Sequence, residues 1–351
     1  MEQLSSQDWV GEISCATSED EWLRLKASGF TQDLPALFQK LIEGYASFTP
    51  NETQLEQAKA WYLERLDAAD KGKAYEQAVE PLQLVSQVPY TQRATRRQLV
   101  KSMTLQQVMA YRDSLLRDAT PEMMVVGNLS AAEVEKLGHS LTQQLANQQD
   151  ANWHSRYVAF KHPVKANLEK AGSSTDSALA ALYIPLGYSE YQSMANSTLL
   201  SQIVQPWFYS QLRTQEQLGY AVFAFQMPVG RQWGIGFLLQ SNTQQPAYLL
   251  KRYQAFYPQA EKRLREMKQS DFAQYQQAMI NDLSQRPQTL DEEAGRYSGD
   301  FTRQNYQFDT RQQVIAQIEK LTPVSLAHFF NQAVMKQEGL AITSQISGNA
   351  S

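Results

Sequence analysis

The sequence predicts an α+β protein built from two similar domains in tandem, each an antiparallel sheet packed with helices. Three observations support this prediction. The chain has 351 residues, which is long enough for two domains. Short segments recur along it at a nearly constant spacing, and strand-like runs alternate with amphipathic helices. Hydrophobic residues make up 42% and charged residues 19%, a normal balance for a globular protein that buries its own core.

The repeat consists of paired segments that lie between about 212 and 220 residues apart, as two copies with small insertions would. The pairs are 30–38 with 242–250, 54–59 with 274–279, 103–107 with 321–325, and 123–130 with 340–347. The second copy reaches back to about residue 160, so the same spacing puts the start of the first copy about 50 residues before Met1. We therefore expect a first domain over 1–155 that is incomplete at its N-terminus and a second over 156–351. A first domain that is simply shorter is the alternative.

The first half of the chain is predicted to be mostly helical. Residues 34–48 and 52–70 carry apolar side chains at helical spacing. Two capping boxes start further helices, Thr104 with Gln107 and Ser130 with Glu133. The second of these follows a strand-like apolar run over 123–130.

The second half combines strands with a long helix. Residues 180–185 read as a strand, and a helix runs from about Tyr191 to Leu218, with Pro206 as a possible kink. Gly219 suits the left-handed position just beyond a helix. Residues 220–229 and 233–241 read as paired strands joined near Gly230 and Arg231.

Other polar and glycine-rich motifs have structural explanations. Gly234 and Gly236 lie inside a strand pattern, so a close backbone approach or a bulge explains them better than phosphate binding. The polar stretch 173–177 reads as a turn. The acidic group 291–293 after Thr289 is typical of a helix N-terminus, and Thr322 before Pro323 starts another helix.

No metal or nucleophile motif is present in the sequence. The four histidines form neither HExxH nor HxxEH, the spacings that place two imidazoles on one helix face around zinc; they are His139, His154, His162 and His328. The single cysteine, Cys15, has no histidine near it and reads as a small apolar residue. We expect no metal bound by this chain.

Charge and hydropathy exclude two classes of partner. The net charge is −4, whereas nucleic-acid-binding proteins usually present a basic face, so no nucleic-acid partner is expected. No apolar run approaches the ~18 residues that a membrane span needs.

One segment is a candidate for binding a ligand. Residues 205–225, QPWFYSQLRTQEQLGYAVFAF, place Arg213 in the last turns of the long helix and Tyr220 at the start of the next strand. Five guanidinium donors and a phenol at one helix–strand corner could hold the carbonyls of an extended peptide or stabilise an oxyanion. An arginine that complements the helix C-terminus, beside a tyrosine on a strand edge, explains the same residues without a ligand.

This segment resembles the signature of the C-terminal portion of the pitrilysin/insulinase family of zinc peptidases. LRTQEQLGYAVFAF carries the resemblance, with PWFYSQ before it and GRQWGIGFLLQS after it. It extends through SFTPNETQLEQAKAWY, AGSSTDSALAA and LAITSQISG to nearly the whole chain. The family implies four related α+β domains around a closed chamber, with the inverted motif HxxEH and its zinc in the first. This chain would then hold most of the third domain and nearly all of the fourth.

The resemblance implies roles for three residues and for the parent protein. Arg213 and Tyr220 match the arginine and tyrosine that bind substrate backbone beside the zinc, and Tyr209 matches, more weakly, an aromatic position near the same pocket. The parent would be a zinc metalloendopeptidase that degrades short polypeptides. Its partner in this reading is the N-terminal catalytic half of the same polypeptide, and the bacterial members imply the periplasm. The alternative is an inactive partner subunit of a processing-peptidase-like complex.

Overall fold

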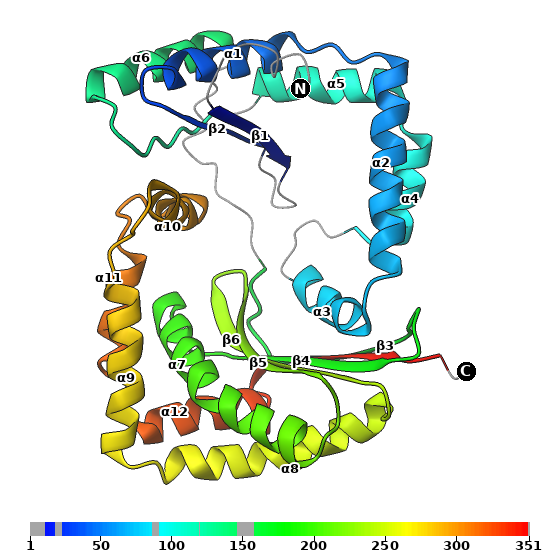
Figure 1. The fold of residues 1–351 in the computed structure, drawn as a ribbon, viewed down its shortest axis with the longest axis vertical. Coiled ribbons are helices and arrows are strands. Elements are labelled where there is room, and N and C mark those ends of the chain that lie inside the picture. Colours follow the sequence, from blue (N-terminus) through cyan, green and yellow to red (C-terminus); the bar gives the residue numbers. More distant parts are fainter. Residues whose placement is uncertain (1–10, 18–22, 86–90, 119, 146–157, 350–351) are drawn as a thin grey trace. The chain divides into compact units, whose positions relative to one another are not determined.

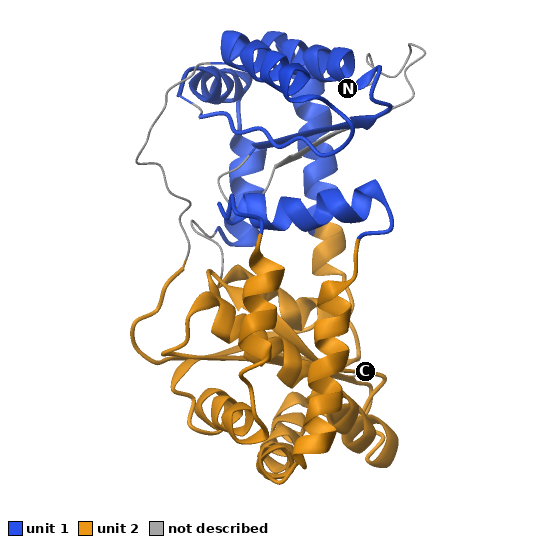
Figure 2. Cartoon of the chain, turned by 90° about the vertical axis from the view of Figure 1, so that its left-hand side faces the viewer, with its two compact units in different colours: residues 1–66, 91–156, 287–308 blue, residues 67–90, 157–286, 309–351 orange. Residues whose placement is uncertain are grey.

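The computed structural model describes residues 11–17, 23–85, 91–118, 120–145 and 158–349. These residues form two compact units, and each unit draws on both halves of the chain (Figure 2). Unit 1 comprises residues 1–66, 91–156 and 287–308, and unit 2 comprises 67–90, 157–286 and 309–351. The predicted boundary between residues 155 and 156 concerns the sequence repeat, and it remains a prediction.

Unit 1 is mainly helical, with one strand pair. Strands β1 (Gly11–Thr17) and β2 (Leu23–Gly29) form an antiparallel hairpin. The helices are α1 (Leu34–Ser47), α2 (Glu52–Asp70, whose last residues belong to unit 2), α4 (Arg93–Ser102), α5 (Leu105–Asp118), α6 (Ala131–Gln144) and α10 (Leu290–Thr302). Both predicted capping boxes are present, at α5 and at α6. Cys15 lies in β1.

Unit 2 is a five-stranded sheet with helices on both faces. Its strands are β3 (Val164–Ala171), β4 (Ser177–Pro185), β5 (Ala221–Val229), β6 (Gln232–Ser241) and β7 (Gly339–Ser347), in the order β3-β7-β4-β6-β5. Its helices are α3 (Ala74–Leu84), α7 (Glu190–Tyr209), α8 (Pro246–Arg265), α9 (Gln269–Ser284), α11 (Thr310–Ile318) and α12 (Pro323–Phe330). Two π-helical turns follow α7 and α12, η2 (Ser210–Gln215) and η3 (Asn331–Met335).

The sheet confirms the α+β class, with one departure from an all-antiparallel arrangement. Strand β4 pairs antiparallel with both β6 and β7, and β5 pairs antiparallel with β6 across the hairpin predicted at Gly230. Strands β3 and β7 run parallel. Thr322 caps α12 and Thr289 caps α10, as predicted.

Strand β4 is buried on both faces, which explains its continuous apolar run. Leu179 and Tyr183 point into a core made with α7, α8, α11 and α12. Leu182 and Ile184 point into a second core, closed by α3. Helices α3 and α8 therefore cover opposite faces of the sheet (Figure 1).

Helices α3 and α10 are the two elements that cross between the halves of the chain. Helix α3 comes from the first half and packs in unit 2, where Ala74, Ala78 and Leu82 are fully buried. Helix α10 comes from the second half and belongs to unit 1, where Arg24 on β2 donates a hydrogen bond to Thr302 at 2.9 Å.

The segment 123–130 is not a strand in the described structure, although its repeat partner 340–347 is β7. The two segments differ in their neighbours: β7 forms backbone hydrogen bonds with β3 on one side and with β4 on the other. The described part of unit 1 places no strand beside residues 123–126.

Candidate functional site

The turn between α7 and β5 carries the signature residues, and its backbone departs from a regular α-helix. After Tyr209 the chain widens into the π-helical turn η2, in which Glu216 N–H donates to the carbonyl of Gln211 at 2.9 Å. Such wide turns are frequent at functional sites. The prediction of one helix to Leu218 is therefore wrong: helical structure ends at Gln215, since the wider turn consumes the remaining residues.

Gly219 is required for a different reason from the one predicted. The left-handed residue after the helix is Gln217, with φ 53°, and not Gly219. A Cβ on residue 219 would overlap the backbone carbonyl oxygen of Gln240 on β6. Glycine therefore allows the turn to lie directly against the sheet just before Tyr220.

Glu216 fixes the turn to α8. Arg252 donates to both of its carboxylate oxygens, from Nε and from Nη2, each at 2.7 Å, and Gln211 donates to one of them at 3.1 Å. The hydrogen bonds from Arg252 are the main reason that the pKa of Glu216 lies below its ordinary value. This carboxylate is consequently occupied and does not neutralise Arg213.

Arg213 lies within η2 and is half-buried. In the described part of the chain its guanidinium makes no hydrogen bond and no ion pair. Arginine carries five donors in a planar fork that matches carboxylates and backbone carbonyls. The turn thus presents a cation whose hydrogen-bonding groups remain available to a ligand.

Tyr220, the second predicted residue, is 49% exposed and is held by its hydroxyl group. The phenol donates to Asp176 Oδ2 at 2.8 Å, and Gln240 Nε2 donates both to the phenol oxygen and, at 2.6 Å, to the same carboxylate oxygen. Burial, followed by the bond to Asp176 and its negative charge, raises the pKa of Tyr220.

The three predicted residues share one region of unit 2, and the described structure shows no hydrogen bond among them. Tyr220 is joined to Asp176 rather than to Arg213. Tyr209, at the end of α7, is 42% exposed, and its hydroxyl has no hydrogen-bond partner among the residues that the structure describes. The predicted substrate role of each residue stays a prediction.

Sequence reasoning missed Asp176 and Gln240. Asp176 lies in the polar stretch 173–177, which does connect two strands but also delivers a carboxylate to Tyr220. Gln240 is 2% exposed and directly follows the buried apolar residues 237–239 of strand β6. A polar amide within an apolar strand signals a specific hydrogen-bonded role, since burial without a partner is costly.

The described residues do not supply a metal site. No group of three or more His, Cys, Asp or Glu side chains there is arranged to hold a metal ion. His139 lies on α6 and His328 on α12, while His162 precedes β3; His154 falls outside the described residues. The residues present therefore do not fit zinc.

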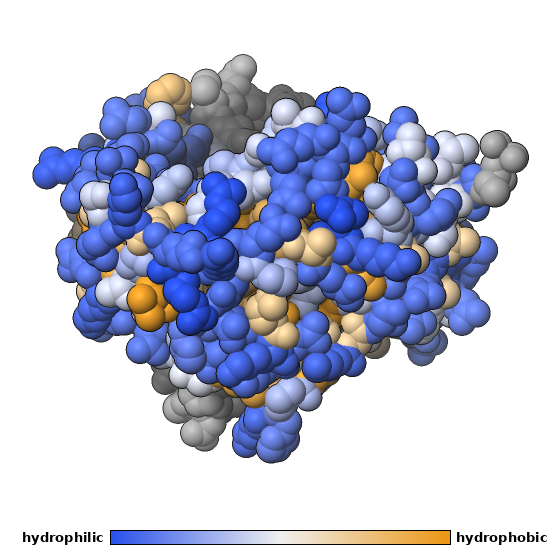
Figure 3. Space-filling view, turned by 90° about the horizontal axis from the view of Figure 1, so that it is seen from below, coloured by the Kyte–Doolittle hydropathy of each residue, from blue (hydrophilic) through white to orange (hydrophobic). Residues whose placement is uncertain are grey.

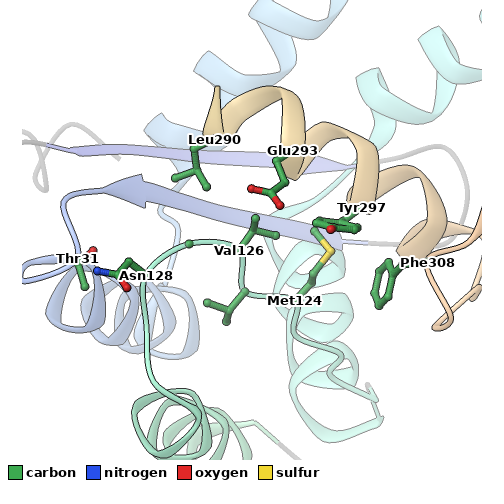
Figure 4. A pocket seen from close by; sticks show the side chains of 10 residues that line it. Thr31, Met124, Val126, Asn128, Leu290, Glu293, Tyr297 and Phe308 are labelled. Atoms are coloured by element: carbon green, nitrogen blue, oxygen red, sulfur yellow. The ribbon is translucent and has the colours of Figure 1, made fainter. Parts of the chain in front are cut away.

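Unit 1 contains a pocket of about 680 Å³, and none of the residues that line it belongs to the turn between α7 and β5. Leu290, Glu293 and Tyr297 of α10 line one side, and Met124 and Val126 lie opposite (Figure 4). Glu293 belongs to the predicted acidic helix N-terminus, at which Thr289 accepts a hydrogen bond from Glu292 N–H. The lining is mostly apolar, with one carboxylate, and shows no group of reactive side chains.

The outer surface of unit 2 is largely hydrophilic on the side seen in Figure 3. On the face that α8 and α12 present, hydrophilic residues predominate and apolar residues are scattered among them (Figure 3). No described helix is both long and apolar enough to cross a membrane.

Two family models match separate parts of the chain. Residues 12–98 match the middle or third domain of peptidase M16, and residues 199–298 match domain 4 of the C-terminal lobe of PqqF-like PQQ synthase. The second match includes Arg213 and Tyr220.

Curated relatives match nearly the whole chain. It is 56% identical over 349 residues to Protease 3 of Salmonella typhi and 54% identical to Protease 3 of Escherichia coli K12. Each alignment covers 99% of this chain and 36% of the relative, so the chain spans about a third of the length of these proteins. Human insulin-degrading enzyme is 25% identical over 320 residues, 31% of its length.

Solved structures agree with this. The crystal structure of pitrilysin matches with a TM-score of 0.92 at 54% identity, over 97% of this chain and 36% of that one. The periplasmic protease PqqL from Escherichia coli matches with a TM-score of 0.70 at 11% identity, which shows the shared fold alone.

Proposed function

We propose that this chain is the C-terminal, non-zinc-binding portion of a zinc metalloendopeptidase of the M16 family, and that it holds the third- and fourth-domain region of that family. The parent enzyme degrades short polypeptides in a closed chamber. Zinc and the general base belong to the N-terminal catalytic half of the same polypeptide, which is the main partner of this chain. The identity to bacterial Protease 3 is the basis on which we propose a periplasmic location.

In this proposal Arg213 and Tyr220 bind the backbone of the peptide. The supporting observation is that Glu216 is engaged by Arg252 while Arg213 keeps its donors available, within the described part of the chain. A guanidinium held half-buried on a rigid turn loses little entropy on binding a carbonyl. Tyr209 adds an exposed aromatic surface at the same end of α7.

Substitution in the complete enzyme tests these roles. Arg213→Ala is expected to lower kcat/KM for peptide cleavage by about 10- to 150-fold, the equivalent of about 1.5 to 3 kcal/mol for hydrogen bonds to a charged group. Tyr220→Phe removes a neutral hydroxyl and is expected to lower it by up to about 10-fold. Zinc content, measured by atomic absorption, should not change.

Two matched substitutions serve as controls. Arg265 is paired with Glu261 on α8, so Arg265→Ala removes an arginine that already has a partner. Tyr306 is 50% exposed and donates to Glu122 at 2.8 Å, so Tyr306→Phe removes a hydroxyl in the same kind of bond as that of Tyr220. If the site variants behave as these controls do, the proposed roles are wrong.

A further inference from the structure

The hydroxyl of Tyr220 is bonded on two sides by groups that are themselves fixed. The orientation of the Gln240 amide follows from its third neighbour, because its Oε1 accepts the backbone N–H of Tyr75 on α3 at 2.9 Å. The Nε2 donors must then face Asp176 and Tyr220, which is also the only orientation that suits a carboxylate. The hydrogen-bond directions in this cluster are therefore determined.

Asp176 is placed by backbone contacts on both sides of its loop. Gly172 N–H donates to the carbonyl of Ser347 at 2.8 Å, and Asn349 N–H donates to the carbonyl of Ser174 at 2.9 Å, so the end of β7 holds the loop between β3 and β4. Gln77 of α3 donates to Ser173 Oγ at 2.7 Å. The carboxylate is therefore positioned before any ligand arrives.

These bonds leave the phenol oxygen of Tyr220 with one lone pair that no hydrogen bond uses in the described structure. A hydroxyl has one donor and two acceptor lone pairs. The donor is committed to Asp176, and one lone pair accepts from Gln240. One lone pair remains, and the ring is half-exposed, so an incoming hydrogen-bond donor can reach the oxygen without breaking either bond.

We propose that Asp176, oriented by Gln240, is a positioning residue that commits the hydroxyl proton of Tyr220, so that Tyr220 meets a bound peptide as the acceptor for a backbone N–H. This inference rests on the proposed function, because it specifies how Tyr220 contacts the peptide. An extended peptide presents N–H and C=O groups alternately, so Arg213, a pure donor, and Tyr220, an acceptor, can hold one backbone together. A carboxylate partner polarises the hydroxyl and strengthens the bond that its oxygen accepts.

The first experiment tests the positioning alone and uses this chain labelled with 3-fluorotyrosine. The Tyr220 resonance is identified by its loss in Tyr220→Phe and is followed by ¹⁹F NMR as pH rises. The groups that raise the pKa of Tyr220 include Asp176 and, more weakly, Tyr75. Asp176→Asn should lower the Tyr220 titration midpoint, because the negative charge is lost while an acceptor remains. Glu122→Gln is the control, and should lower the midpoint of Tyr306 only. An unchanged Tyr220 midpoint in Asp176→Asn overturns the positioning role.

The second experiment tests the acceptor role in the complete enzyme with a model peptide methylated at one backbone nitrogen at a time. At one position, methylation should raise KM several-fold in the wild type and in Glu122→Gln, and should have no such effect in Tyr220→Phe. In Asp176→Ala that difference should shrink, because the phenol proton is no longer committed. If no position distinguishes the wild type from Tyr220→Phe, the acceptor role is wrong.

The outcomes separate this inference from the proposed function. If Tyr220→Phe cleaves peptides as well as the wild type does, the proposed substrate role of Tyr220 fails, while the titration still decides whether Asp176 holds its proton. If Tyr220→Phe is impaired and Asp176→Ala is not, the proposed function stands and the positioning role falls.

Discussion

The backbone of Gly219 lies against the carbonyl oxygen of Gln240, the residue whose side chain holds the Tyr220 hydroxyl. The same strand residue thus sets the path of the turn through its main chain and the position of the phenol through its amide. Gly219 and Tyr220, adjacent in the sequence motif, therefore both contact Gln240 on β6.

Gly219→Ala is expected to destabilise unit 2 by about 1 to 3 kcal/mol, as overpacking does in other cores, because a backbone oxygen cannot rotate away. Thermal unfolding followed by circular dichroism measures the effect. Gly295 on α10 is the matched control, since nothing lies within 4 Å of its added Cβ. Gly295→Ala should stabilise by up to about 1 kcal/mol through helix propensity. Equal effects of the two changes would contradict the close approach at Gly219.

Acid should loosen the turn through Glu216. Because its folded-state pKa is lowered, mainly by Arg252, its contribution to stability is present above the unfolded pKa of about 4.3 and is lost as pH falls through the lower folded value. The pair is partly exposed, so the contribution is about 1 kcal/mol. Glu216→Gln should lower the free energy of unfolding at pH 7 and flatten its decline below pH 5, as measured by urea denaturation. A decline as steep as in the wild type would show that other carboxylates dominate.

Helix α3 should stabilise unit 2 although it precedes the predicted second domain. Leu82→Ala removes a fully buried side chain from the core that α3 forms with β4 and should cost about 2 to 5 kcal/mol. Leu99 on α4 is 55% exposed, so Leu99→Ala should cost far less. Hydrogen exchange should report the loss from Leu82→Ala at amides of β4 and β7. A loss of protection confined to unit 1 would contradict the packing of α3 in unit 2.

The sequence predicted those features that depend on neighbouring residues. The apolar run of β4, the hairpin at Gly230 and the caps at Ser130 and Thr322 follow from local rules, and all are present. It did not predict the π-helical end of α7, nor the pairing of Glu216 in the turn that follows with Arg252, 36 positions away.

The same distinction explains the candidate site. Arg213 and Tyr220 were found through a contiguous motif, whereas Asp176 precedes Tyr220 by 44 positions and was assigned to a turn. The sequence did not show that α3 belongs to unit 2 and α10 to unit 1, because periodicity identifies an apolar helix face without indicating what that face packs against.

Gln205 should protect the exposed edge of the sheet in unit 2. Strand β5 lies at the edge of the sheet. An edge strand tolerates Pro228, because a residue there can lack a backbone N–H without breaking a hydrogen bond between strands. The side-chain amide of Gln205 on α7 accepts from Ala224 N–H and donates to the carbonyl of Val222 at 3.5 Å, as a neighbouring strand would. Unpaired edge groups invite pairing with another chain.

Gln205→Ala is therefore expected to cost about 1 to 3 kcal/mol, because it leaves a part-buried donor unpaired, and to cause association that increases with protein concentration. Sedimentation velocity over a tenfold concentration range measures the association. Among the described residues, the Gln259 side chain on α8 bonds only to Ala255 of its own helix, so Gln259→Ala should behave as the wild type does. If Gln205→Ala is destabilised yet does not associate at any concentration, its amide satisfies Ala224 without guarding the edge, and the unpaired groups of β5 are protected by the twist of the strand instead.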